Sequence, residues 1–363
     1  MISLNKTHES FLKSNKASEI LFAHDIPVGN LETLDSKTIQ VLEKALNEIN
    51  LTREEVLLLT MVEMNHVSIL MSVSNFLRKK YKGELISFSK NIFIPLTQLC
   101  RDQCSYCTFK YEPGEGDLFF SPEKVLEAAK KSTELGCTEM LFVSGDKPEL
   151  MYDVYKKELE KIGYSSTSDY MIGMSELCLE EGIFPHSNLG IAKIDELKRF
   201  KNSNPSMGLM LESISERLME PGEAHYRCPD KYPRARIKTI SDAGKLNIPW
   251  TSGILIGIGE NWEERVDSII ELKRINDEFG HIQEIIIQNF SPKPGIKMEG
   301  SPVPTDLDMI KTVAISKILM GKDVNIQVPP NLNAKTYTLH IFSGVNDLGG
   351  VSPLTIDYVN PES

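Results

Sequence analysis

The sequence is poor in cysteine, in positive charge and in long hydrophobic runs, and each shortage excludes a class of protein. Six cysteines in 363 residues are too few for a disulfide scaffold. With 40 Lys and Arg against 51 Asp and Glu, the net charge of −11 gives no general excess of positive charge for nucleic-acid phosphates. No uncharged apolar stretch reaches about 18 residues, so no membrane span is predicted. The N-terminus also lacks the apolar core of a secretory signal, so we expect a cytoplasmic protein.

The first 85 residues carry helical patterns. One pattern covers residues 33–50, and a second helix follows Thr52, which is a predicted N-cap with Glu55 as its capping-box partner. The second helix carries a stripe of three methionines: Met61, Met64 and Met71. We expect this stripe to pack in the core, with a substrate or partner surface as the alternative.

From residue 86 onward, short apolar runs alternate with amphipathic segments. Strands are predicted at 93–97, 140–144, 184–187, 208–211, 251–256, 282–288, 324–328 and 340–344. Helices are predicted at 122–135, 169–181, 193–200, 233–245, 262–279 and 307–320. This alternation predicts an α/β fold, a (β/α)8 TIM-type barrel over 86–363 with an N-terminal helical extension over 1–85. A doubly wound open sheet is the structural alternative.

Three of the six cysteines lie within eight residues, directly after the first predicted barrel strand. Cys100, Cys104 and Cys107 have the spacing C-x3-C-x2-C. A structural zinc site needs four protein ligands, usually as two separated pairs, and the sequence offers no second pair. Three thiolates suit a 4Fe–4S cluster with one iron open to a small molecule. A zinc site, a disulfide and chance clustering are the alternatives.

This loop resembles the cluster motif of the radical S-adenosylmethionine (SAM) superfamily, with Tyr106 in the aromatic position before the last cysteine. The resemblance implies a 4Fe–4S cluster held by Cys100, Cys104 and Cys107, and a fourth iron that SAM chelates. It also implies that the reduced cluster cleaves SAM to methionine and a 5′-deoxyadenosyl radical. That radical then abstracts a hydrogen atom from the substrate.

Further segments resemble the SAM-binding parts of the superfamily. Ser144, Gly145 and Asp146 occupy the place of its Gly-Gly-Glu segment, whose backbone and acid hold the SAM amino group. Asp146 stands where the family more often has Glu, and an ordinary turn after the strand is the alternative. Glu212, at the end of the fourth predicted strand, is expected to accept hydrogen bonds from the SAM ribose, unless it is a solvated acid.

The run GILIGIGE on the fifth predicted strand resembles the G-x-I-x-G-x-x-E run that flanks the SAM adenine. Gly253 and Gly257 occupy its glycine positions, and Leu255 stands in the isoleucine position. Arg236 is expected to pair with the SAM carboxylate, although Arg234 competes for that role.

Longer strings resemble one family within the superfamily, the 7,8-didemethyl-8-hydroxy-5-deazariboflavin (FO) synthases, in their subunit 1. The strings lie at residues 224–236, 242–260, 288–295, 327–332 and 344–353. The resemblance implies a lyase of deazaflavin (coenzyme F420) biosynthesis that closes a hydroxybenzyl–ribityluracil adduct to FO and releases ammonia. It also implies a companion radical SAM subunit 2 that makes the adduct, and an electron donor such as ferredoxin or flavodoxin. No nucleic-acid or membrane partner is expected.

The substrate needs hydrogen-bonding groups for its uracil and ribityl parts, and a base for ring closure. Polar residues at predicted strand ends or loops can supply the hydrogen bonds: His186, Asn188, Asn289 and Asn346. His225 and Asp347 are the candidate catalytic bases, with loop or capping roles as the alternative. The remaining cysteines, Cys137, Cys178 and Cys228, are expected to be structural.

Two other functions remain open on the sequence. One is another member of the same group, either the companion hydroxybenzyl-transferring subunit or a menaquinone-pathway radical SAM enzyme. The other is a barrel that uses the three clustered cysteines as a structural metal site.

Overall fold

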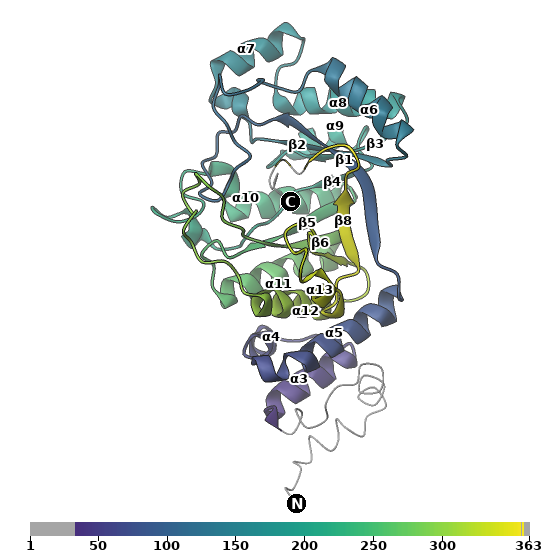
Figure 1. Cartoon of the computed structure of the whole chain (residues 1–363), viewed down its shortest axis with the longest axis vertical. Coiled ribbons are helices and arrows are strands. Elements are labelled where there is room, and N and C mark those ends of the chain that lie inside the picture. Colours follow the sequence, from purple (N-terminus) through teal and green to yellow (C-terminus); the bar gives the residue numbers. More distant parts are fainter. Residues whose placement is uncertain (1–32, 357, 359–363) are drawn as a thin grey trace, which may run out of the picture.

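The computed structural model describes residues 33–356 and residue 358. Eight parallel strands close into a barrel in chain order (Figure 1). They are β1 (Ser87–Thr97), β2 (Glu139–Ser144), β3 (Phe184–Asn188), β4 (Ser206–Gly208), β5 (Trp250–Ile256), β6 (Ile282–Asn289), β7 (Asn325–Gln327) and β8 (Asp347–Val351). The closed barrel confirms the predicted (β/α)8 fold and excludes the open sheet.

Helices on the outside of the barrel connect the strands. They are α6 (Pro122–Glu134), α7 (Asp153–Lys161), α8 (Thr167–Glu180), α9 (Ile194–Phe200), α10 (Pro233–Lys245), α11 (Trp262–Phe279), α12 (Asp306–Met320) and α13 (Tyr337–Phe342). The predicted bounds of α10 and α11 are confirmed. Capping residues at both ends of α11 explain why its bounds can be read from the sequence. Asn261 caps its first turn in a capping box with Glu264, and Gly280 ends it at a φ of 66°.

The prediction for the last strand is wrong. Residues 340–344 lie in and after α13, and the eighth strand is β8 instead. The sequence of β8 contains two adjacent glycines, which favour a turn, but here the glycines allow close packing inside the barrel. A Cβ on Gly349 would lie 1.8 Å from Gln327 Nε2, and one on Gly350 would lie 2.4 Å from Asn91 Nδ2. The fourth strand also differs, since β4 begins two residues before the predicted start.

Two N-terminal helices, α4 (Arg53–Thr60) and α5 (Val67–Lys82), pack against α11 and α12, and α3 (Ser36–Leu46) packs against α4 and α5 (Figure 1). The capping box of Thr52 and Glu55 is confirmed at the start of α4. Lys311 of α12 donates to the carbonyl of Thr60 at 2.7 Å, and Arg53 donates to Asp267 Oδ2 of α11 at 2.9 Å. Apolar side chains of these helices belong to the same buried cluster as the barrel core.

The predicted methionine stripe does not lie in the buried core, and Met71 is only half-buried. Met61 and Met64 are 75% and 64% exposed, so the expectation of core packing is wrong for both. The single predicted helix is broken between α4 and α5, which are bent by 104° with respect to each other, and both methionines lie at that break. Among the described residues, no single helix is long and apolar enough to cross a membrane, although this bent pair passes that test jointly.

Candidate SAM and cluster site

The barrel holds a cavity of about 1380 Å³ whose lining runs from the amino ends of the strands to the loops after their carboxyl ends. Most of the predicted site residues line it: Cys100, Cys104, Tyr106, Cys107, Ser144, Gly145, Asp146, His186, Asn188, Glu212, Leu255, Asn289 and Asp347. Five predicted residues are not among its described lining: His225, Arg236, Gly253, Gly257 and Asn346. The structure therefore gathers residues from most of the barrel strands into one chamber.

The cysteine loop follows β1 and faces the cavity. All three of its cysteines are free thiols, which argues against the disulfide alternative. The amide of Asp146 donates to Cys100 Sγ at 3.2 Å, so the loop after β2 directly supports the first cysteine. Burial, together with the negative charges of Asp146 and Asp102, raises the pKa of the Cys100 thiol to about 12. A thiolate at this position therefore needs a positive partner such as iron.

Asp146 offers a buried acceptor beside the cysteine loop. Its Oδ1 atom has no hydrogen-bond partner among the described residues. Burial and the neighbouring Asp230 raise the pKa of Asp146 to about 7. Gly190, at a φ of +81°, makes room for this carboxylate, since a Cβ there would lie 1.7 Å from Asp146 Oδ1. An unpaired buried carboxylate of this kind suits an ammonium group.

Ser144 and Gly145, the two residues before Asp146, also line the cavity. Ser144 lines the cavity, and its hydroxyl is buried with no partner among the described residues. A Cβ on Gly145 would lie 1.9 Å from the carbonyl oxygen of Leu99, so only glycine lets the two loops approach so closely. Residues 144–146 therefore lie in close contact with the cysteine loop and line the cavity. This favours a binding role over an ordinary turn.

Glu212 is held by two cations. It has a φ of +65°, which is rare for a residue with a side chain, and its backbone bridges to Ile254 of β5. Lys231 Nζ lies 2.5 Å from Glu212 Oε1, and Arg236 Nη2 lies 3.6 Å from it. Although burial opposes ionisation, these two cations lower the pKa of Glu212 to about 2. The carboxylate is therefore charged and fixed at the cavity wall, and it is not a solvated acid.

Lys231 lines the cavity but had no role in the sequence-based prediction. Its contact with Glu212 joins two segments that are 19 residues apart, so no local motif indicates it. The predicted pairing of Arg236 with the SAM carboxylate is not supported. Arg236 donates to the carbonyls of Met210 and Asp230, both at 2.7 Å, and so fixes the backbone behind the cavity lining. The competing Arg234 is also unsuitable, since its side chain is 77% exposed and pairs with Glu216.

Three carboxylates lie together behind the cysteine loop: those of Asp102, Asp146 and Asp230. Asp230 is already paired with two cations. Arg101 Nη2 lies 2.6 Å from Asp230 Oδ1, and Lys147 Nζ lies 3.4 Å from the same atom. These ion pairs link the cysteine loop to the segment that carries Lys231. They also neutralise the negative charge of Asp230, which a metal ion would otherwise need to balance.

His225 is separated from the cavity by Tyr106. Its Nε2 lies 3.0 Å from the Tyr106 hydroxyl, and the two rings pack edge to face. Burial, together with the positive charge of Lys231, lowers the pKa of His225 to about 3. The geometry therefore does not support His225 as the catalytic base, and places it as a support for Tyr106 next to the cysteines.

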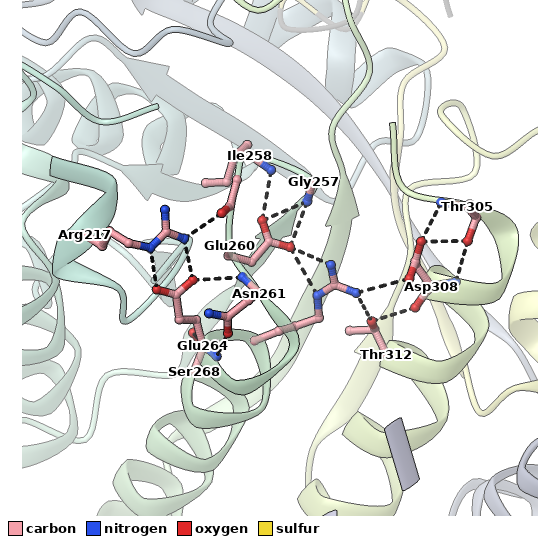
Figure 2. Close-up of polar contacts among 12 residues, drawn as sticks. Arg217, Gly257, Ile258, Glu260, Asn261, Glu264, Ser268, Thr305, Asp308 and Thr312 are labelled. Atoms are coloured by element: carbon pink, nitrogen blue, oxygen red, sulfur yellow. Dashed lines mark hydrogen bonds and ion pairs between the residues drawn. The ribbon is translucent and has the colours of Figure 1, made fainter. Parts of the chain in front are cut away.

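One buried glutamate side chain, Glu260, binds the backbone of the loop after β5 (Figure 2). Its carboxylate accepts from the amides of Gly257 at 2.9 Å and Ile258 at 3.0 Å, and it pairs with Arg265 at 2.7 Å. A second cavity of about 370 Å³ lies here, lined by Ser105 of the cysteine loop and by residues 257–259. The arrangement offers backbone and apolar surface for a flat ring beside the cysteine loop.

Close packing also explains the two glycines of this segment. A Cβ on Gly253 would lie 2.2 Å from the carbonyl oxygen of Ile286 on β6. Gly257 has a φ of +91°, and a Cβ there would lie 2.5 Å from Pro304 Cδ. Both glycines therefore shape the wall through their backbones, without entering the main cavity.

The predicted substrate residues divide into two groups. His186, Asn188 and Asn289 line the cavity, as does the candidate base Asp347. Asn346 instead has a structural role, because its Oδ1 accepts from the amide of Ile326 at 3.1 Å and its Nδ2 donates to Asn325 at 2.9 Å. The three remaining cysteines are all buried: Cys137, Cys178 and Cys228.

The model of the radical SAM superfamily matches residues 94–272 of this chain. The synthase named 7,8-didemethyl-8-hydroxy-5-deazariboflavin synthase from Methanothermobacter thermautotrophicus is 52% identical over 278 residues, 77% of this chain and 84% of the relative. The enzyme of the same name from Methanopyrus kandleri is 49% identical over 281 residues, again 77% of this chain and 84% of the relative. The one from Methanocaldococcus jannaschii is 43% identical and spans 88% of this chain and 85% of the relative.

Solved structures share the fold at low sequence identity. Methylornithine synthase superposes with a TM-score of 0.69 at 18% identity, covering 86% of both chains. A maturase of the [FeFe]-hydrogenase superposes with a TM-score of 0.73 at 17% identity, covering 94% of this chain and 72% of the maturase. These two likenesses support the barrel architecture.

Proposed function

The chain belongs to the 7,8-didemethyl-8-hydroxy-5-deazariboflavin (FO) synthase family of the radical SAM superfamily, and on this premise we propose that it is the ammonia-releasing cyclase of FO formation. The substrate is 5-amino-5-(4-hydroxybenzyl)-6-(D-ribitylimino)-5,6-dihydrouracil, and the products are FO, ammonia, methionine and 5′-deoxyadenosine. One observation carries the proposal: the 52% identity to the Methanothermobacter thermautotrophicus synthase extends over 278 residues.

The 4Fe–4S cluster and SAM of the superfamily fit the residues at the cavity. Cys100, Cys104 and Cys107 would hold the cluster, because all three are free thiols that line one chamber. When bound, cluster and SAM together supply the 5′-deoxyadenosyl radical that abstracts hydrogen from the substrate. Asp146, through its unpaired Oδ1, would bind the SAM ammonium, and Glu212 would accept from the ribose hydroxyls.

The remaining SAM contacts would come from the neighbouring walls. Ser144 and Gly145 would flank the amino acid part of SAM, and Tyr106 would close the wall next to the cluster. Leu255 lines the main cavity, while Gly253 and Gly257 set the path of the β5 backbone along which the adenine would lie. We assign Arg236 to holding Glu212 and its loop in place.

The chain would position the substrate inside the cavity and shield it from solvent. His186, Asn188 and Asn289 would hydrogen-bond the adduct from the cavity wall. Asp347 is the candidate base for ring closure, since its carboxylate lines the cavity, although it also accepts from the amide of Gly349 at 2.6 Å. Enclosure matters because a carbon radical is quenched by any accessible hydrogen donor.

Partners and location follow from the same proposal. A companion radical SAM subunit 2 would supply the adduct, and a ferredoxin or flavodoxin would supply the electron. A reducing cytoplasm suits six free thiols. We also propose that residues 1–85 form an extension of the barrel domain, because α3 to α5 share its buried core; residues 1–32 lie outside the described residues.

Product analysis tests the ammonia-releasing assignment. Anaerobically reconstituted protein with SAM, reductant and adduct should release ammonia and FO in equal amounts. FO formation without ammonia would contradict the lyase assignment.

A parallel reaction tests the alternatives. With tyrosine and 5-amino-6-(D-ribitylamino)uracil in place of the adduct, no hydroxybenzyl transfer is expected, whereas transfer would identify the companion subunit. Stoichiometric zinc, in place of about four iron and four sulfide per chain, would favour a structural metal site.

A further inference from the structure

The amino-terminal end of the barrel interior is polar, whereas branched apolar side chains usually fill this part of a (β/α)8 barrel. Strand register places Asn91 of β1 beside Glu139 of β2, and Glu284 of β6 between Thr251 of β5 and Asn325 of β7. All five of these residues line the cavity, and we call them the barrel floor. The floor belongs to the same chamber as the cysteines, at its opposite end.

The floor has one buried acceptor without a donor and two long hydrogen bonds. Asn91 is only 3% exposed, yet its Oδ1 has no hydrogen-bond partner among the described residues. Its Nδ2 donates to Glu139 Oε1 at a long 3.4 Å, and Thr251 donates to Glu284 Oε1 at 3.3 Å. Since an unpaired buried acceptor is costly and long hydrogen bonds are weak, this end of the cavity suits a ligand that brings hydrogen-bond donors.

The charges around the floor disfavour an anionic ligand. Glu284 faces Asp347 of β8, Glu139 of β2 and the amide of Gln327, whose nitrogen lies 2.9 Å from Glu284 Oε1 when turned towards it. His186 of β3 faces Glu139 at 4.0 Å and bonds Ser206 at 2.7 Å. Burial and the charge of Asp347 raise the pKa of Glu284 to about 8. At neutral pH, Glu284 can therefore both donate and accept a hydrogen bond.

The layer of side chains above the floor contributes apolar surface to the cavity. Two residues further along their strands, Phe93, Leu141 and Ile286 line the cavity with apolar surface. The next inward residue on β6 is Gln288, four residues from Glu284 and therefore about 13 Å along the strand. The cavity thus runs from a polar floor through an apolar girdle to the polar SAM site.

We propose that the barrel floor binds the hydroxyl-rich ribityl chain of the substrate, and so sets which end of the substrate faces the cluster. Hydroxyls both donate and accept, so several of them on a flexible chain match a floor that combines the unpaired Asn91 Oδ1 with the carboxyl group of Glu284, and the apolar girdle suits the flat ring that the chain carries. This inference rests on the proposed function for the identity of the ligand. It adds an orientation, with the ribityl group at the amino end of the strands and the hydroxybenzyl group towards the cysteine loop.

Paired ligands test the inference without turnover. The cluster-loaded protein with SAM but no reductant is titrated with 5-amino-6-(D-ribitylamino)uracil and with its 6-pentylamino analogue, which lacks the hydroxyls. The wild-type protein should bind the ribityl compound at least about 10-fold more tightly. In Glu284→Met, this preference should fall below about threefold through weaker binding of the ribityl compound alone.

Controls separate a local effect from misfolding. Glu278→Met makes the same change at an exposed position of α11 and should keep the full preference. Thr251→Val, which is nearly isosteric, provides a second floor variant in case Glu284→Met does not fold. Equal affinity of the wild-type protein for both ligands, or equal weakening of both by Glu284→Met and Thr251→Val, would overturn the proposal.

Three further results would have distinct meanings. Saturable binding of Mg²⁺ or Ca²⁺ alone that is lost in Glu284→Met would overturn the proposal in favour of a cation site. If the ribityl preference is found but no FO forms with the adduct, the floor assignment stands and the proposed reaction fails. If FO forms without any ribityl preference, the proposed reaction stands and the floor assignment fails.

Discussion

At the scale of single residues, the site combines groups that a local motif indicates with groups that only the fold brings together. The cysteines, Ser144 and Asp146 stand in short motifs, and all of them line the cavity. Lys231 was missed because its partner Glu212 lies on a different segment. His225 is predicted as a candidate base because it lies in a loop. The sequence does not reveal that Tyr106 packs between the His225 ring and the cavity.

The cluster assignment predicts a sharp difference between two cysteines. Cys104→Ala should abolish SAM cleavage and lower the iron content of the reconstituted protein. Cys178→Ala should change neither, because Cys178 is fully buried in α8, where its thiol contacts Met140 Sδ at 3.2 Å. Iron and sulfide analysis with a 5′-deoxyadenosine assay gives both readouts. Full cluster content in Cys104→Ala would contradict the assignment.

The unpaired Oδ1 of Asp146 predicts a loss of SAM affinity on neutralisation. Asp146→Asn keeps the size of the side chain but removes the charge, so binding of the SAM ammonium should weaken about 10-fold or more. Equilibrium binding of SAM to the cluster-loaded variant measures this effect. Iron content should match the wild-type protein, and an unchanged SAM affinity would refute the role of Asp146.

At the scale of elements, the sequence predicts those helices and strands whose boundaries are set locally. The bounds of α10 and α11 were predicted, whereas α7 was missed because it is highly charged and buries only Tyr155 and Leu159. The eighth strand was misplaced because its glycines are explained by contacts with Gln327 and Asn91, which lie on other strands. Features that depend on distant contacts are those that local patterns do not reveal.

The loop between β3 and α9 predicts a glycine requirement that can be tested with a matched pair. Gly190 and Gly182 have similar φ angles, +81° and +79°, so alanine costs similar backbone strain at both. Only at Gly190 would the new Cβ collide with a neighbour, Asp146 Oδ1 at 1.7 Å. Gly190→Ala should therefore lower SAM affinity about 10-fold or more, as Asp146→Asn does.

The Gly182→Ala control should keep the wild-type affinity for SAM, since nothing lies within 4 Å of its added Cβ. Thermal unfolding of both variants reports the shared cost of the backbone strain. Equal SAM affinities in the two variants would show that the contact between Gly190 and Asp146 does not shape the site.

At the scale of the whole molecule, the half-buried Glu284 links stability to pH. Its folded pKa of about 8 lies above the usual 4.5, so the folded state holds the proton more tightly than the unfolded state. This contribution to stability is full below about pH 4.5 and is lost as pH rises through about 8. Glu284→Gln removes the titration, so the variant should gain stability relative to the wild-type protein between pH 5 and pH 9.

Urea unfolding at several pH values measures this difference. The gain should exceed about 1.4 kcal/mol, the equivalent of one pKa unit. Most other titrating groups contribute equally to both proteins and cancel in the comparison. A difference that does not change with pH would contradict the elevated pKa of Glu284.

We expect a single chamber to hold SAM at the cysteine loop together with the ribityluracil adduct. The most direct measurement is the formation of FO by the anaerobically reconstituted protein with SAM, reductant and the purified adduct, followed by the flavin-like fluorescence of the product. We predict FO that appears together with 5′-deoxyadenosine and that is absent with Cys104→Ala. Formation of 5′-deoxyadenosine without any fluorescent product would contradict the assigned reaction.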